Sequence, residues 1–302
     1  MIDFTYILAA SHSGSTLLTM VLASHPRIAS VGETSAVLWR GKSDSATCSC
    51  GTALSACAFW AKVREGMARR GADWESPTFQ TDFRLRGRRW TDRVLRAEHQ
   101  GRLLEAVRDA ALAASPAWRR ESPAIFGANR ALIETVCGLK GTTVFLDSSK
   151  EPHRLKFLMR IPGLRVRVIQ LVRDGRGVAA SYLRRNEFPI ERACDEWRRS
   201  LVSEEHLLRR LPPERALRVR YEDFCRDAAG WSRRIFEFMN VDAGHDVSRF
   251  HLAEHHILGN RMRLSATGDI RLDEKWRREM TPAMLEVFER TCGGINRRYG
   301  YA

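Results

Sequence analysis

The 302-residue sequence has no long apolar run, and this absence limits what the protein can be. No stretch approaches the ~20 apolar residues that a membrane-spanning helix needs. The first apolar segment is short and lacks a basic start and a small-residue cleavage site, which is not typical of a signal peptide. Internal repeats, low-complexity tracts and obvious linkers are also missing. We therefore expect a single cytoplasmic domain over residues 1–302.

Lysine is scarce as well, since only six of the 50 Lys and Arg residues are lysine, while the formal net charge is +14. Arginine suits bidentate recognition of phosphate, sulfate or carboxylate. The alternative is that arginine reflects a composition bias and covers a solvated surface. A basic nucleic-acid-binding protein also stays open, although such proteins cluster basic residues with aromatic ones and here arginine is scattered.

The cysteine count is seven, and an odd number argues against a complete disulfide framework. Three of them, Cys48, Cys50 and Cys57, lie in "CSCGTALSACAFW". Their spacing fits zinc poorly, because zinc sites usually have C-x2-C pairs and a fourth ligand. We favour a turn of buried thiols or a local disulfide over zinc, and we predict that the protein requires no metal.

Strand and helix patterns alternate along most of the chain. Strands are predicted over 4–10, 143–147 and 165–172, and a short fourth strand ends at Tyr221. A helix is predicted after each strand. The first covers 15–24, the second runs from 152 to about 160, the third runs from the turn at 174–175 to about 185, and the fourth contains "WSRRIFEFMN". This alternation predicts right-handed βαβ units and a P-loop-like, three-layer α/β/α fold with a central parallel sheet. Ligands of such sheets bind at the carboxyl ends of the strands.

The segment from about 42 to 122 departs from this pattern. It is rich in Trp and Arg and shows helical periodicity in "RWTDRVLRAEHQGRLLEAVRDAALAA". We interpret it as a helical insertion, which either walls an acceptor pocket or forms a plain packing layer.

The stretch "YILAASHSGSTLLTMVLASHP" has the strand-loop-helix layout of a phosphate-binding loop, yet the usual Gly-Lys before Ser/Thr is missing. Small residues from Ser11 to Thr16 let the backbone approach an anion, and the start of the helix favours a phosphate there. Gly14 permits a tight turn, and the hydroxyls of Ser13 and Ser15 can donate hydrogen bonds. The alternative is an ordinary helix N-cap.

A second anion site is indicated by "LVRDGRGVAASYLRR". Arg173 ends a strand, and Ser181 and Arg185 lie on one face of the helix after it because they are four residues apart. They can gather a second phosphate, or else be part of a capped helix with surface arginines.

These two motifs resemble the 5′-phosphosulfate loop and the 3′-phosphate-binding strand-helix of sulfotransferases that use 3′-phosphoadenosine 5′-phosphosulfate (PAPS). The resemblance implies a donor bound without magnesium, which explains a loop that lacks lysine. It assigns the 3′-phosphate to Arg173, Ser181 and Arg185. The 5′-phosphosulfate would be held by Ser11, His12, Ser13, Gly14, Ser15, Thr16 and Leu17.

Other matches carry the resemblance over most of the chain outside 42–122. "SVGET" resembles a Gly-Glu-Glu-Thr stretch of protein-tyrosine sulfotransferases, which places Glu33 at the catalytic base. "SSKEP" resembles their Asn-Lys-Asp-Pro, which places Lys150 at the catalytic lysine. "RYEDF" resembles an element whose tyrosine, here Tyr221, contacts adenine.

Two late stretches, "HHILGNRMRL" and "DEKW", resemble the segment that closes over the nucleotide. They bring in Lys275, and also Arg261 and Arg263, which either clamp the 3′-phosphate bidentately or are exposed loop charges.

The expected chemistry is an in-line displacement at sulfur. Glu33 would accept the proton of the acceptor hydroxyl, and Lys150 would offset charge on the leaving phosphate. The alternatives are a helix cap for Glu33 and a surface lysine beside Asp147 for Lys150.

Two positions depart from the family pattern. His12 stands where most relatives have Lys or Arg, so a charge that titrates at about pH 6 to 7 replaces a permanent one. Three roles are open for His12. It would help to stabilise the leaving phosphate as a cation, donate a hydrogen bond as a neutral imidazole, or serve only as a spacer in the loop. Glu274 stands where the tyrosine enzymes have a stabilising serine, and Ser265 is too far upstream to replace that serine.

The sequence thus predicts a PAPS-dependent sulfotransferase that acts on a hydroxyl of a small-molecule, carbohydrate or lipid acceptor. A P-loop small-molecule kinase is the rival. Against it stand the missing Gly-Lys-Ser/Thr and the lack of a strand ending in a magnesium-binding Asp, with Asp147 as the one exception.

Overall fold

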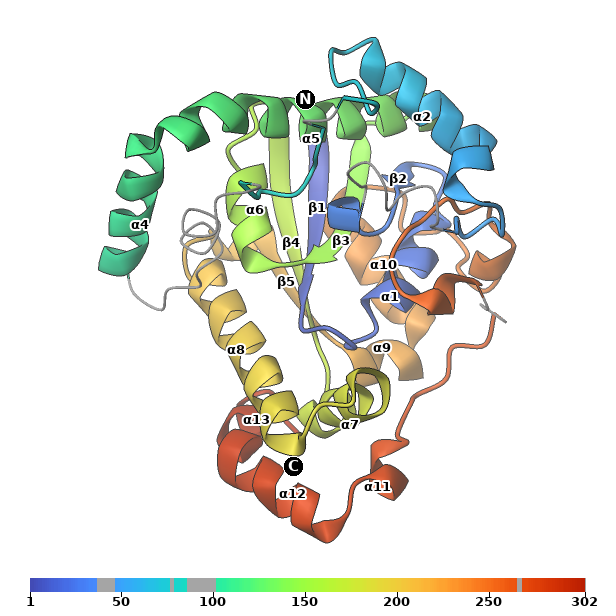
Figure 1. Ribbon diagram of the computed structural model, residues 1–302. Helices are drawn as coiled ribbons and strands as arrows, with labels where there is room; N and C mark the ends of the chain where they lie inside the picture. The colour runs from blue at the N-terminus through green and yellow to red at the C-terminus, as the bar shows by residue number, and fades with distance from the viewer. Residues whose placement is uncertain (37–46, 77–78, 86–101, 265–267, 302) are drawn as a thin grey trace.

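The central sheet of the computed structural model is parallel and confirms the predicted three-layer α/β/α fold. The structure describes residues 1–36, 47–76, 79–85, 102–264 and 268–301. Within these residues the strands have the order β2-β3-β1-β4-β5. Figure 1 shows the sheet at the centre with helices on both sides. The strands are β1 (Ile2–Ala9), β2 (Ile28–Ser30), β3 (Val144–Lys150), β4 (Leu164–Val172) and β5 (Ala216–Arg220).

Helices bury both faces of β1, which explains why five of its last six residues, from Phe4 to Ala9, are apolar. Ile7 and Ala9 pack with α1 (Ser15–Ala23), α9 (Tyr221–Arg226) and α10 (Ala228–Met239). The alternate residues Phe4, Tyr6 and Leu8 face the opposite layer. That layer includes α2 (Ala58–Ala68), α5 (Pro116–Lys140) and α6 (Pro152–Leu158).

A third apolar cluster lies beyond the carboxyl end of β4, where Val172 packs with Trp197 and Phe288. It joins α8 (Ile190–Leu208), which contacts α7 and α12, to the last helices of the chain. Figure 1 shows these helices together below the sheet. They are α7 (Gly175–Asn186), α11 (Trp276–Glu279), α12 (Pro282–Phe288) and α13 (Gly294–Arg298).

The described part of the predicted insertion packs onto the sheet. Trp60 and Trp118 are buried in the same cluster as Phe4. The helix α5 begins inside the predicted insertion, where Ser115 accepts a hydrogen bond from Trp118 N, and continues past residue 122 to Lys140. A further helix, α4 (Arg102–Ala114), precedes it, while 86–101 lie outside the described residues. The described residues of α2 and α5 thus belong to the helical layer on this face of the sheet.

Small differences from the predicted elements follow from long-range pairing. The strand β3 runs three residues beyond 147, since Ser148 N donates to Gly32 O at 2.9 Å. The strand β2 has only three residues and pairs with β3 through Ile28, Ala29 and Ser30. Tyr221 begins α9 instead of ending a strand.

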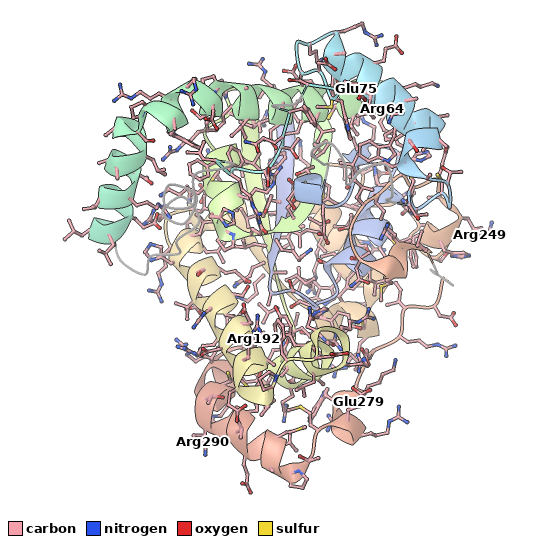
Figure 2. The ribbon with its side chains drawn as sticks, viewed as in Figure 1. Arg64, Glu75, Arg192, Arg249, Glu279 and Arg290 are labelled. Atoms are coloured by element: carbon pink, nitrogen blue, oxygen red, sulfur yellow. The ribbon has the colours of Figure 1, made fainter. Side chains whose placement is uncertain are left out.

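Many arginines lie at the surface, which agrees with the alternative that the excess of arginine covers a solvated surface. Figure 2 shows Arg64, Arg192, Arg249 and Arg290 at the periphery of the molecule. Among the described residues, none of the helices has both the length and the apolar character needed to cross a bilayer.

Candidate functional site

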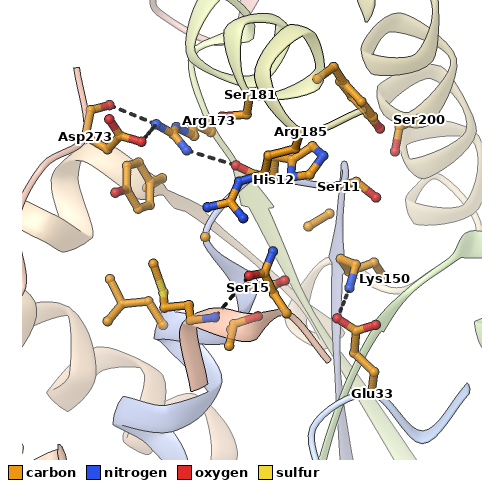
Figure 3. Close-up of a pocket in the computed structure, with 18 of the residues that line it drawn as sticks. Ser11, His12, Ser15, Glu33, Lys150, Arg173, Ser181, Arg185, Ser200 and Asp273 are labelled. Carbon is orange, nitrogen blue, oxygen red and sulfur yellow. Dashed lines mark hydrogen bonds and ion pairs between the residues drawn. The ribbon is translucent and has the colours of Figure 1, made fainter. Parts of the chain in front are cut away.

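A cavity of about 1550 Å³ opens at the carboxyl ends of the strands and gathers most of the predicted site residues. They come from β1, β3, β4 and the helices that follow these strands, and Figure 3 shows several of them converging. Segments far apart in the sequence therefore meet at one place, as parallel strands require. The predicted residues that line the cavity are Ser11, His12, Gly14, Ser15, Thr16, Leu17, Glu33, Lys150, Arg173, Ser181, Arg185, Tyr221 and Lys275.

Three predicted nucleotide-binding residues are not placed on the cavity wall. Ser13 is buried behind the loop. Arg263 donates to the carbonyl of Gly259 and, at 2.7 Å, to the carbonyl of Thr47, so it joins two chain segments. Arg261 begins the short 3-10 helix η5 (Arg261–Leu264), and its side chain lies outside the described part of the structure, as does Ser265.

The loop after β1 turns sharply before α1. His12 has φ 66° and Gly14 has φ 91°, both in the left-handed region. A Cβ on Gly14 would lie 2.5 Å from Cδ2 of Tyr221, so only glycine fits between the loop and that ring. The first N–H groups of α1, from Ser15 on, have no acceptor within the helix and offer an anion hydrogen bonds at the cavity.

Glu33 and Lys150 form an ion pair in the cavity wall, shown by a dashed line in Figure 3. Their side chains are 22% and 16% exposed, so both are reachable from the cavity yet partly shielded. Glu33 follows β2, and its N–H donates to Leu258 O at 3.3 Å. Lys150 ends β3 with φ 74°, a conformation that non-glycine residues rarely adopt. Such strain is frequent where a side chain must be held in one direction.

A buried network behind the wall fixes the two segments that carry this pair. Asp147 is 1% exposed and accepts hydrogen bonds from Thr34 Oγ1, Ser149 Oγ at 2.6 Å and Ser149 N at 2.9 Å. Arg154 donates to Thr34 Oγ1 at 2.7 Å and to Asn129 Oδ1 at 2.6 Å. Asp147 is therefore occupied by the protein itself and does not face the cavity.

Arg173 lies between the loop and the segment at 273. Its guanidinium donates to His12 O at 2.9 Å and to Asp273 O at 2.8 Å, and it stacks over the Tyr221 ring at 4.5 Å. The Asp273 carboxylate is 3.2 Å away. Burial would raise the pKa of Asp273, but the charge of Arg173 outweighs it and the pKa is lowered. Nearby on α7, Ser181 Oγ donates to Gly177 O at 2.9 Å.

His12 is held against α7. Its Nε2 donates to Asn186 Oδ1 at 2.9 Å, and its ring meets the Tyr182 ring edge-on at 4.7 Å. Burial lowers the pKa of His12 from 6.5, the Asn186 hydrogen bond opposes this, and Arg185 and Lys150 lower the pKa further. These surroundings therefore favour the neutral imidazole over the charged one in the protein alone.

Several lining residues were missed in the sequence. Four further arginines line the cavity, and in the sequence nothing separates them from the arginines of the surface. Glu274 also lines it and pairs with Arg277 at 3.0 Å. The four arginines are Arg184, Arg199, Arg271 and Arg278.

A parallel sheet whose first loop opens a helix at the cavity, with a lysine and a carboxylate facing the same cavity, is the arrangement of a transferase of P-loop-like fold. The model of the sulfotransferase family matches residues 5–245. The chain belongs to this family and is a sulfotransferase. The match includes both phosphate motifs, Glu33, Lys150 and Tyr221, and ends before Arg261 and Lys275.

Several solved structures are similar to the chain, and the first of these supports the fold. The sulfotransferase domain of the curacin biosynthetic pathway has a TM-score of 0.55 at 17% identity, covering 100% of this chain and 99% of that one. A sulfotransferase domain of the Synechococcus PCC 7002 olefin synthase has a TM-score of 0.47 at 19% identity, with 95% and 94% covered. A Mycobacterium tuberculosis sulfotransferase has a TM-score of 0.47 at 16% identity, covering 97% of this chain and 77% of that one. No curated protein sequence matches the chain.

Proposed function

We propose that this sulfotransferase moves the sulfuryl group of PAPS to a hydroxyl of a small-molecule, carbohydrate or lipid acceptor. The acceptor oxygen forms a bond to sulfur while the bond from sulfur to the phosphate oxygen breaks, which leaves 3′-phosphoadenosine 5′-phosphate (PAP). The acceptor proton passes to Glu33. The observation that supports this proposal best is the Glu33–Lys150 pair, which faces the same cavity as the phosphate loop.

Each part of the donor has candidate partners. The loop 11–17 would hold the 5′-phosphosulfate, with Lys150 and His12 beside the leaving phosphate. Arg173, Ser181 and Arg185 would hold the 3′-phosphate, and the Tyr221 ring would contact adenine, with Lys275 closing over the nucleotide. Arg173 already stacks on that ring, so the two groups are arranged together.

The kinase alternative is less well supported. A magnesium-dependent kinase needs a carboxylate at the phosphates. Asp147 is the residue that sequence offered for this, and its oxygens accept hydrogen bonds from Thr34 and Ser149 away from the cavity. We therefore propose a reaction without a catalytic metal, and the cytoplasm remains the predicted compartment.

Thermal stabilisation by three ligands separates the candidate functions. A ligand that binds the folded state raises the melting temperature. We expect PAP without metal to raise it, and ATP with Mg²⁺ or an oligonucleotide to have little effect. If only ATP with Mg²⁺ stabilises the protein, the donor assignment is wrong.

The acceptor class needs a separate experiment. The enzyme would be incubated with isotopically labelled PAPS and panels of phenols, sugars, lipids and tyrosine peptides, and products would be identified by mass spectrometry. We expect a sulfated product from at least one of the phenols, sugars or lipids. Sulfation of peptides alone would contradict the proposed acceptor class.

A further inference from the structure

Four donor atoms that are far apart in the sequence meet outside the catalytic cavity. Cys48 Sγ, Cys50 Sγ, Cys57 Sγ and a ring nitrogen of His256 all lie within 4.8 Å of one another. His256 is 199 residues beyond Cys57 along the chain. Local spacing of the cysteines therefore gave no sign of this fourth group. None of the four lines the large cavity.

Three of the six separations between these atoms match the edges of a tetrahedron around zinc, and the other three are no longer than 4.8 Å. His256 Nδ1 is 3.5 Å from Cys48 Sγ and 3.4 Å from Cys57 Sγ, and Cys50 Sγ is 3.7 Å from Cys57 Sγ. Zinc bonds of ~2.3 Å to sulfur and ~2.0 Å to nitrogen give tetrahedral edges of ~3.8 Å between sulfurs and ~3.5 Å between sulfur and nitrogen. The donors are thus already spaced as ligands.

We propose that Cys48, Cys50, Cys57 and His256 bind a structural zinc ion. Three thiolates and one imidazole are a donor set that zinc prefers in structural sites. Four protein ligands leave no open position for a substrate, so the ion would take no part in sulfuryl transfer. The site is therefore independent of the reaction proposed for the cavity.

The surroundings of His256 favour coordination through Nδ1. Its Nε2 donates to Glu254 Oε1 at 2.7 Å, which leaves the Nδ1 lone pair free to bind a metal. A carboxylate behind a histidine ligand is a regular feature of zinc sites, because it fixes the tautomer and the ring. Phe59 also stacks on the ring, with centroids 4.4 Å apart and planes 4° apart. The His256 side chain is only 10% exposed.

The chain at Cys48 and Cys50 forms a tight turn, in which Cys48 is buried and Cys50 is exposed. Cys48 N donates to Thr52 O at 2.8 Å, and Gly51, with φ 88°, donates from its N–H to Cys48 O at 2.9 Å. Cys57 directly precedes the first residue of α2. Ser49 ties this turn to the histidine segment through bonds of 2.6 Å to His255 O and 2.9 Å from Ile257 N.

A disulfide between Cys50 and Cys57 is the rival explanation. It would join the two sulfurs that are 3.7 Å apart. It would leave Cys48, His256 and the supporting Glu254 without a role, although two thiols crowd the same ring nitrogen. Zinc gives all four groups a partner, and this is why the geometry favours it.

The proposed ion would stabilise one wall of the catalytic cavity from behind. The histidine segment continues to Leu258, whose N–H donates to Val31 O at 2.8 Å and whose carbonyl accepts from Glu33 N at 3.3 Å. Leu258 is only two positions beyond His256 along the chain. Removal of zinc should therefore loosen the position of Glu33 as well as destabilise the fold.

Metal content is the direct test. The enzyme would be purified without chelators or added metal, and zinc would be measured by plasma mass spectrometry. We expect about one zinc per chain, and removal of it by a strong chelator should lower the melting temperature. Cobalt substitution should give the visible absorption of a tetrahedral thiolate site. Zinc-free folded protein that does not take up Zn²⁺ after reduction would overturn the proposal.

Matched variants locate the ion. Cys48→Ser and His256→Ala should lose zinc, while Cys137→Ser, which removes a buried thiol of α5 far along the chain from this cluster, should keep it. If the first two variants fail to fold, Glu254→Gln provides the test. The Glu254 side chain is exposed, so its replacement should leave the fold intact and weaken zinc affinity ~10–100-fold. A non-reduced peptide linking Cys50 to Cys57 in metal-free protein would establish the disulfide instead.

Discussion

Replacement of Glu33 by Gln tests the proposed base with the smallest possible change in shape. The amide has the size of the carboxylate but cannot accept the acceptor proton. Glu33 contacts Lys150 through an ion pair whose side chains are 22% and 16% exposed. Loss of such a partly solvated pair costs up to ~1 kcal/mol of folding free energy. The backbone pairing of Glu33 with Leu258 does not depend on its side chain.

The effect on turnover should be much larger than the effect on stability. A positioned general base contributes ~10²–10⁴-fold to the rate, which corresponds to about 2.7–5.4 kcal/mol of transition-state free energy. Lys150 stays in place in the Gln variant, so the charge next to the leaving phosphate is retained. Because the Glu33 side chain pairs with Lys150, which the variant keeps, PAP affinity should change less than tenfold.

The assay is single-turnover transfer from labelled PAPS to an acceptor found in the panels, with PAP binding measured by calorimetry. Glu151→Gln is the matched control, since Glu151 lines the same cavity with a side chain that is 48% exposed and paired with His153 at 3.5 Å. We expect this control to keep its turnover. The reasoning is refuted if Glu33→Gln stays within tenfold of the natural enzyme, or if both variants lose activity equally.

Three further substitutions probe the nucleotide site. Arg173→Ala should weaken PAP binding ~10–100-fold by calorimetry, because charged hydrogen bonds to phosphate are lost, whereas Arg176→Ala should not; equal affinities would remove Arg173 from the site. Burial lowers the pKa of His12, and the bound phosphates of PAP should raise it. The protein should therefore take up a proton when PAP binds, and its affinity for PAP should fall as the pH rises from about 6 to 8. His12→Asn should abolish that proton uptake, and an unchanged uptake would show that other groups titrate. Gly14→Ala would place a Cβ 2.5 Å from Tyr221, and should lower both the melting temperature and PAP affinity; unchanged values would show that the loop adapts.

The fold could be predicted because its signals are local. The strands β1, β3 and β4 are apolar and each is followed by a helix, so the period of the pattern is enough to infer a parallel sheet. The short β2 lacked such a signal, since its three residues become a strand only by pairing with β3. The end of β3 was also placed too early, because Ser148 and Lys150 look like loop residues until their partners are known.

The candidate site was predictable where motif residues follow strands. Glu33 and Lys150 were expected from separate motifs, and the structure brings them into contact. Interactions between distant segments were not predictable in this way. His256 completes the cysteine cluster from the other end of the chain, and Arg263 bonds to the backbone near Thr47. Such partners have no fixed spacing, so sequence patterns do not reveal them.

The two sides of the large cavity are held by different kinds of interaction. On one side Arg154 is fully buried and donates to Thr34 and Asn129, and to Thr81 O at 2.6 Å, so the segments that carry Glu33 and Lys150 are tied together by the protein itself. On the other side the segment at Asp273 is held by the guanidinium of Arg173, for which an arriving phosphate would compete. An anion that binds Arg173 would therefore weaken the contact to Asp273 and leave the Arg154 network unchanged.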